Sequence, residues 1–167
     1  MTPLNSHELR EGFSSFATGV TVITCIDMDG IIAGVTINSF NTVSLEPPLI
    51  LWSLTKNSRL MPLFTVGHKQ LIHVLDRSQE KLAVRFAKIK HEQFIGVEHH
   101  LTLNGLAKIS GCVAYFECET VAVHPGGDHN IIVAKVLSLE DHPDREPLIF
   151  ARSKFVGLNL TESSLSQ

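Results

Sequence analysis

The sequence lacks the features that mark several large classes of protein. Its three cysteines in 167 residues are too few for the disulfide framework of a small secreted domain. Its longest apolar stretches, such as residues 49–52, fall far short of the roughly 18 residues that span a bilayer. The N-terminus is polar and acidic, so it does not predict a signal peptide. These absences favour a soluble protein of the reducing cytoplasm, with no membrane segment.

An excess of positive charge is also missing. The chain has 14 Lys and Arg against 17 Asp and Glu, a formal net charge of −3. A nucleic-acid-binding surface needs the opposite sign, so we expect no nucleic-acid partner. The motifs GxGxxG, GxxxxGK[ST], HExxH, GxSxG and CxxC are absent as well, which gives a Rossmann domain, a kinase or a nucleophilic hydrolase no support.

Length and composition predict one globular domain over residues 1–167. Hydrophobic residues make up 44% of the chain and charged residues 19%, which is enough apolar material for a sizeable core. β-Branched and aliphatic runs predict six or seven strands, and helical spacing predicts two or three short helices. The strands are expected at residues 20–26, 31–40, 48–54, 70–75, 112–123, 131–139 and 147–151, and the helices after Asn5 and at residues 58–66 and 78–89.

The connections between most of these strands are too short for parallel crossovers. The pattern therefore predicts an antiparallel β-barrel with short helices outside it, in the mainly-β or α+β class. Asn5 with Glu8, and Asp76 with Gln79, have the spacing of a helix capping box. Residues 48–54 are nearly all apolar, which predicts a strand buried on both faces or nearly so.

The spacing of the cysteines and histidines argues against a metal site. Cys112, Cys118 and His124 share one face of a predicted strand, and His129 follows. Six residues of strand span about 20 Å, whereas zinc ligands lie about 2.0–2.3 Å from one ion. We therefore expect no metal site, and we expect the cysteines to fill the core as small hydrophobes.

Polar side chains cluster between two apolar strands, in residues 34–48. They are Asn38, Ser39, Asn41, Thr42 and Ser44, with Phe40 among them. The segment is either a polar loop or a site that offers hydrogen bonds to a planar ligand, with Phe40 as an apolar wall. The sequence leaves both readings open.

Two further segments have an ordinary and a functional interpretation. Residues 56–58 combine a lysine, an amide and a hydroxyl before a predicted helix, which suits either an anion such as phosphate or a simple helix cap. Residues 126–129 form either a plain hairpin turn or a glycine-rich loop that presents His129 to a pocket. Neither choice is decided by the residues alone.

Four motifs occur in one order along the chain: FATGVTV from Phe16, NSF from Asn38, VSLEPPL from Val43 and GDH from Gly127. With these motifs the sequence resembles the flavin reductase-like family, which comprises the small NAD(P)H:flavin oxidoreductase components of two-component monooxygenases. The resemblance covers nearly the whole chain. It implies a split β-barrel of the FMN-binding type, usually a homodimer with flavin sites near the subunit interface.

The resemblance also implies an activity. FMN or FAD would accept a hydride from NADH or NADPH, and the reduced flavin would serve a separate monooxygenase by diffusion. A flavin held tightly as a prosthetic group is a close variant. The alternative is a binding protein rather than an enzyme, namely a non-enzymatic split barrel that binds flavin or haem as a carrier or sensor. The sequence does not decide between the two flavins or between the two nicotinamides.

The same resemblance assigns site residues. It places His129 near the nicotinamide or the isoalloxazine ring as the catalytic residue. The cofactor-binding residues that it implies are Thr36, Asn38, Ser39, Phe40, Asn41 and Ser44 against the flavin, Lys56, Asn57 and Ser58 toward its phosphate, and Phe86 and Ala87 lining the site. Three positions depart from the common pattern, namely His73, Asn130 and Phe155, and they leave the corresponding contacts open.

Overall fold

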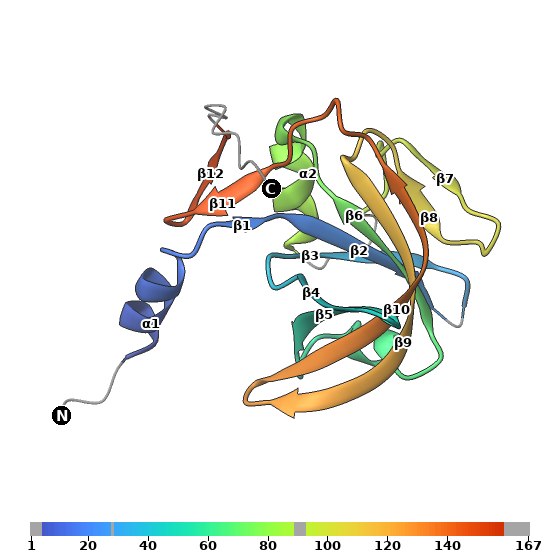
Figure 1. Cartoon of the computed structure of the whole chain (residues 1–167), viewed down its shortest axis with the longest axis horizontal. Coiled ribbons are helices and arrows are strands. Elements are labelled where there is room, and N and C mark those ends of the chain that lie inside the picture. The colour runs from blue at the N-terminus through green and yellow to red at the C-terminus, as the bar shows by residue number, and fades with distance from the viewer. Residues whose placement is uncertain (1–4, 28, 89–92, 159–167) are drawn as a thin grey trace.

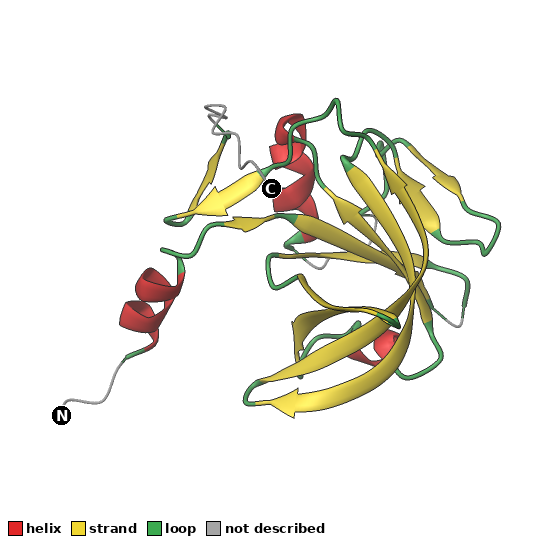
Figure 2. Ribbon diagram, viewed as in Figure 1, coloured by secondary structure: helices red, strands yellow, loops and turns green. Residues whose placement is uncertain are grey.

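The computed structural model describes residues 5–27, 29–88 and 93–158 (Figure 1). Within these residues, strands dominate and helices are few and short (Figure 2). The elements are α1 (Ser6–Phe13), β1 (Thr18–Gly19), β2 (Thr21–Ile26), β3 (Ile32–Ile37), β4 (Asn41–Leu45), β5 (Pro48–Thr55), the 3₁₀ helix η1 (Met61–Phe64), β6 (Lys69–Val74), the 3₁₀ helix η2 (Arg77–Gln79), α2 (Glu80–Phe86), β7 (His99–Leu101), β8 (Ala107–Ile109), β9 (Ala114–Gly126), β10 (His129–Asp141), β11 (Ile149–Ala151) and β12 (Lys154–Val156).

Seven strands form one curved antiparallel sheet in the order β3-β2-β6-β9-β10-β5-β4. The sheet curls so that β3 and β5, which are not neighbours in this order, come into contact. Two smaller sheets, β1-β11-β12 and β7-β8, flank it. The structure confirms the predicted antiparallel split barrel, and it places α2 beside the barrel rather than inside it (Figure 2).

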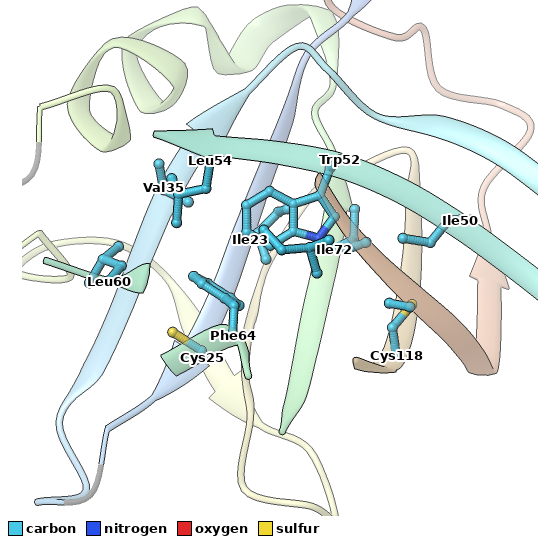
Figure 3. Packing of buried hydrophobic residues seen from close by; sticks show 12 residues of the cluster. Ile23, Cys25, Val35, Ile50, Trp52, Leu54, Leu60, Phe64, Ile72 and Cys118 are labelled. Atoms are coloured by element: carbon cyan, nitrogen blue, oxygen red, sulfur yellow. The ribbon is translucent and has the colours of Figure 1, made fainter. Parts of the chain in front are cut away.

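Two hydrophobic clusters lie on the two faces of the sheet. Successive residues of a strand point to opposite faces, so Val22 joins one cluster and Ile23 the other. The inner cluster centres on Trp52, whose ring meets Phe64 edge-on at 4.7 Å (Figure 3). The indole N–H of Trp52 donates to Gln70 at 2.9 Å, which satisfies a buried polar group that would otherwise be costly. The outer cluster lies beneath α2.

Several local predictions are confirmed, and one helix is not. Both capping boxes are present, at Asn5 and at Asp76. The helix expected over residues 58–66 is instead the short 3₁₀ helix η1. Gly67, whose φ of 87° lies in the left-handed region, turns the chain soon after η1 into β6. The helical spacing there reflects contacts with the inner cluster rather than a long helix.

Strand β5 corrects a second expectation. Its residues alternate between buried and more exposed positions, whereas the sequence predicted burial, or near burial, on both faces. Ile50, Trp52 and Leu54 face the inner cluster, while Leu51 and Ser53 are half-buried on the outer face. That outer face becomes part of the candidate site described below. The described helices include none that is long and apolar enough to cross a bilayer.

Gly34 of β3 is needed for the close approach of α2. A Cβ added at Gly34 would lie 2.7 Å from two ring atoms of Phe86, which is fully buried. We expect Gly34→Ala to lower the free energy of unfolding by about 1–3 kcal/mol, because the ring has no room to move aside. Urea unfolding measures the loss. Gly19→Ala is the control, since nothing lies within 4 Å of its added Cβ; an equal loss in both variants would contradict the packing argument.

Candidate functional site

The end of β5 brings together two segments that lie far apart in the sequence. In the sheet, Thr55 pairs with His129 at the start of β10. The next residue, Lys56, donates its backbone N–H to the carbonyl of Asp128 at 3.0 Å. Its Nζ donates to the carbonyl of Gly127 at 2.6 Å. The lysine segment and the GDH turn therefore form one site rather than two.

The β9–β10 hairpin presents His129 on the outside of the barrel. Gly127 and Asp128 form its two-residue turn, in which Gly127 has a φ of 68° that favours glycine. Ile132 and Ala134 of β10 face the inner core, so the alternation of the strand directs His129 and Ile131 to the outer face. The His129 side chain is 46% exposed.

One ring nitrogen of His129 is occupied within the turn. Its Nδ1 lies 2.7 Å from Oδ1 of Asp128, in a hydrogen bond that fixes the orientation of the ring. This bond, helped by the charge of the imidazole and by Lys56, lowers the pKa of the Asp128 carboxyl. The opposite ring nitrogen, Nε2, is thereby left on the side of the ring away from Asp128. Such a pair can orient a ligand or stabilise charge on it.

Residues 56–58 divide into two exposed side chains and one buried one. Lys56 and Asn57 are exposed at the end of β5. Ser58 is 8% exposed, and its Oγ accepts the backbone N–H of Leu60 at 3.2 Å. Ser58 therefore shapes the turn that leads to η1, whereas Lys56 and Asn57 offer a cation and an amide to the surroundings.

The polar segment before β4 is anchored to β5 by Ser39. The Ser39 hydroxyl accepts the backbone N–H of Ser53 at 2.9 Å and donates to the Ser53 carbonyl at 3.3 Å. It thus takes the place of a strand partner, because the pairing of β4 with β5 stops at Leu51. Ser53 was missed by the sequence reasoning, although a serine in an otherwise apolar strand was a usable signal.

The neighbours of Ser39 point in two directions. Phe40 stacks on Phe116 with ring centroids 5.7 Å apart, against the inner cluster. Asn38 and Asn41 are exposed, and Ser44 is half-buried further along β4. Part of the segment expected as a possible loop is therefore the edge strand β4. Phe40 of this segment packs against the inner cluster, and the amides of Asn38 and Asn41 are exposed.

A second group of predicted residues lies where β3 meets α2. The Thr36 hydroxyl donates to the backbone carbonyl of Ala83 in α2 at 2.7 Å. Phe86 is fully buried in the outer cluster, with its ring 5.0 Å from that of Phe94. Ala87, the C-cap of α2, is exposed. Thr36 and Phe86 hold the helix on the barrel, and only Ala87 of this group lies at the surface.

The three positions that depart from the family pattern each contact other residues of the chain. His73 is fully buried, with its Nδ1 2.9 Å from the Val22 carbonyl and its Nε2 accepting the Ile109 N–H at 3.1 Å. Asn130 contacts the sulfur of Met61 at 3.3 Å. Phe155 meets Phe150 at 5.3 Å between ring centroids. The contacts of all three are with the protein's own interior or its C-terminal hairpin.

The cysteines are buried free thiols. Burial raises the pKa of Cys25 and of Cys118 to about 12 and that of Cys112 to about 11, so each is a neutral thiol at physiological pH. In the parts of the chain that the structure describes, no group of three His, Cys, Asp or Glu side chains could hold a metal ion.

A family model described as "Flavin reductase like domain" matches residues 13–159. The chain belongs to the flavin reductase-like family. The FMN reductase (NADH) SmoA of Agrobacterium fabrum is 41% identical over 151 residues, which cover 90% of this chain and 85% of SmoA. The reductase subunit HsaB of a flavin-dependent monooxygenase from Rhodococcus jostii is 33% identical, over 93% of this chain and 79% of HsaB.

A solved structure in the flavin reductase-like family has the same architecture. It is the NADH:FAD oxidoreductase SgcE6 of Streptomyces globisporus, which superposes with a TM-score of 0.89 at 33% identity, over 97% of this chain and 98% of that one. SgcE6 has also been solved in complex with NAD and FAD fragments. Some relatives are longer, and this chain spans only about half (54%) of one of them.

Proposed function

We propose that this member of the flavin reductase-like family transfers a hydride from NADH or NADPH to FMN or FAD. A bound flavin supplies the electron-accepting ring, and the protein supplies position and charge. The observation that carries the proposal is the junction at the end of β5, where Lys56 lies against the GDH turn and His129 faces outward. SmoA and SgcE6, whose names state this activity with NADH, support it.

The side chains at this junction fit a flavin nucleotide. A phosphate needs a cation and amide donors, which Lys56 and Asn57 offer at the surface. The polar edge of a flavin ring needs hydrogen-bond partners, which the exposed amides of Asn38 and Asn41 can provide. We assign Ser39, Phe40, Ser58, Thr36 and Phe86 to shaping the walls of the site.

The remaining residues that the family resemblance implies are Ser44 and Ala87, which we place at the borders of the site.

Orientation of the nicotinamide and flavin rings is the main demand of a hydride transfer. We therefore give His129 the task of positioning the nicotinamide or of stabilising charge on the reduced flavin. Its ring is held for this by Asp128.

Hydride transfer is tested by mixing the purified chain with each pair of NADH or NADPH and FMN or FAD. Oxidation of the nicotinamide, followed by its near-ultraviolet absorbance, is the expected result, and the four rates define both preferences. Absence of oxidation with every pair would overturn the proposal and favour a flavin carrier. Visible flavin colour in the purified protein would indicate a prosthetic flavin, and colourless protein a flavin that enters and leaves as substrate.

Lys56→Met gives a prediction for the phosphate contact. We expect FMN affinity to fall by about tenfold, which corresponds to one charge-assisted hydrogen bond. Affinity for riboflavin, which has no phosphate, should not change. Quenching of flavin fluorescence measures both. Lys135→Met, at an exposed position further along β10, is the control; equal losses for FMN and riboflavin in the Lys56 variant would refute the phosphate role.

We further propose that the chain works as a cytoplasmic homodimer that supplies a separate oxygenase. Helix α1 stands clear of the barrel and buries none of its residues (Figure 1). Phe13 and Phe16 are 72% and 78% exposed, and a second copy would remove such large apolar groups from water. The name of HsaB supports an oxygenase partner, and the three free thiols support a reducing compartment. Sedimentation equilibrium tests the dimer, and a monomer mass at micromolar concentration would refute it.

A further inference from the structure

A cavity of about 610 Å³ lies under the β7–β8 hairpin. Its walls come from the β7–β8 segment, from β9 and from the distal part of β10. It shares no residue with the set assigned to the flavin. Its volume lies within the range of about 300–1,000 Å³ that is typical of sites for small organic molecules.

Glu117 of β9 is the unusual group in this cavity. It lines the cavity and is only 9% exposed. Its Oε1 accepts a hydrogen bond from the amide of Asn104, whose own carbonyl accepts from Lys69 Nζ at 2.9 Å. No hydrogen bond reaches Oε2 from the residues that the structure describes. One oxygen of this nine-tenths buried carboxylate is therefore available to accept a hydrogen bond from a ligand.

The other charges around the cavity are already balanced. Lys108 Nζ lies 2.5 Å from Glu140, which also accepts a hydrogen bond from His142 Nε2 at 3.0 Å. The same ammonium group lies 4.2 Å from the centre of the Tyr115 ring. Lys69 stands across the β6–β9 ladder from Glu119, and its Nζ is bonded to Asn104 rather than to Glu117. None of the ion pairs among the described residues includes Glu117.

Leucine side chains form the apolar part of the cavity lining. The cavity is lined by Leu71 and by four leucines that are well exposed at its rim, namely Leu101, Leu103, Leu137 and Leu139. Leu103 is fully exposed, and Leu139 is 62% exposed. A molecule that covered these leucines would bury apolar surface, which is favourable. The cavity therefore combines an apolar surface with a buried anion.

We propose that this cavity binds a small organic cation, a primary ammonium or an amidinium on an apolar body. The cationic group would donate to Oε2 of Glu117, and the apolar body would lie on the leucines. A charge-assisted bond to a partly desolvated carboxylate is stronger than a neutral one. A neutral analogue would leave the carboxylate without a counter-charge, and an anionic analogue would be repelled. This site goes beyond flavin reduction and does not depend on it.

Phenethylamine, phenethyl alcohol and phenylacetate are suitable probes, because they share an aromatic body and differ in charge. Isothermal titration of the full chain should detect phenethylamine and neither of the others. Glu117→Gln keeps an acceptor for Asn104 and removes the charge, so it should weaken phenethylamine binding by about tenfold or more. Glu11→Gln removes an exposed carboxylate on α1, outside the cavity lining, and should bind like the parent chain.

A blocking variant keeps the test valid if Glu117→Gln does not fold. Leu137→Trp changes a half-exposed rim residue, so it should leave the fold intact while filling part of the cavity. It should abolish phenethylamine binding. The proposal is overturned if phenethylamine gives no heat at millimolar concentration, if the alcohol binds as well as the amine, or if binding survives in the folded Glu117 or Leu137 variant.

Discussion

Replacing His129 by alanine should lower kcat/KM for the reduced nicotinamide by about tenfold to a hundredfold, which is the range expected when a group that orients a substrate or stabilises its charge is lost. Flavin affinity should change little, because Lys56 and the amides of the β3–β4 segment remain. The fold should be retained as well, since the side chain is 46% exposed and its hydrogen bond is made to the adjacent residue. Steady-state kinetics with both substrates, together with flavin titration, measure these quantities.

Two further variants test whether the loss is specific to His129 and whether Asp128 contributes to it. His124→Ala removes an exposed histidine from the same hairpin, and it should leave the kinetics unchanged. Asp128→Asn weakens the bond that orients the His129 ring, so a smaller loss than that of His129→Ala is expected. Unchanged kcat/KM in His129→Ala would remove the residue from the mechanism, and so would an equal loss in His124→Ala.

The residue patterns predicted the parts of this candidate site separately, and only the family resemblance assigned them to one flavin. Lys56 and Gly127 are 71 positions apart, and only the register of β5 against β10 brings them together. That register places Thr55 opposite His129. A one-residue slip would turn His129 into the core. Such long-range pairing is set by burial over the whole sheet, which a local pattern of residues does not contain.

The weakest sequence signals belong to strands with little burial. β4 lies at the edge of the seven-stranded sheet and pairs with β5, through a register shift between Thr42 and Ser44. Its residues are mostly exposed, so the alternation that marks a half-buried strand is missing. The strand therefore looked like a polar loop. By contrast, β2 and β6 are largely buried, and their apolar runs predicted them well.

Phe86 and Ser58 show a second limit of prediction from sequence, because a motif does not give the direction of a side chain. The family resemblance implies that Phe86 lines the flavin site and that Ser58 approaches the flavin phosphate, and both roles stay predictions. The structure buries Phe86 fully against β3 and bonds the Ser58 hydroxyl to the Leu60 N–H. A residue beside a site can be fixed in place because it supports the wall rather than because it touches the ligand. A sequence motif contains both kinds of residue, and only the direction of each side chain separates them.

Acid should destabilise the protein through His73 by as much as about 3 kcal/mol. Burial lowers the pKa of this imidazole from 6.5 to about 4. The unfolded chain therefore takes up the proton first as the pH falls. The contribution of the neutral ring to stability is complete above pH 6.5, decreases between pH 6.5 and 4, and is lost below that. A difference of between two and three pKa units corresponds to about 3 kcal/mol.

The neutral ring has a defined structural task, which explains why its protonation is costly. Its Nδ1 donates to the Val22 carbonyl of β2, and its Nε2 accepts the N–H of Ile109 in β8. It thus joins three elements, β2, β6 and β8, within the outer cluster. A proton on Nε2 would point at the N–H of Ile109, so two donors would face each other, and it would leave a buried charge without a partner. The positive charge of Lys108 would add further repulsion.

His73→Asn removes the titration and keeps a donor and an acceptor at the same position. We expect it to cost about 1–3 kcal/mol at pH 7.5, because the smaller side chain leaves a cavity, and to lose much less stability than the parent chain between pH 7 and 4.5. Urea unfolding at several pH values gives both numbers. Carboxyl groups with a lowered pKa, Asp128 and Glu140, also reduce stability in acid, but they are common to both chains and cancel in the comparison. His124→Asn should follow the parent curve, and parallel curves for His73→Asn and the parent chain would show that the buried imidazole does not control the response.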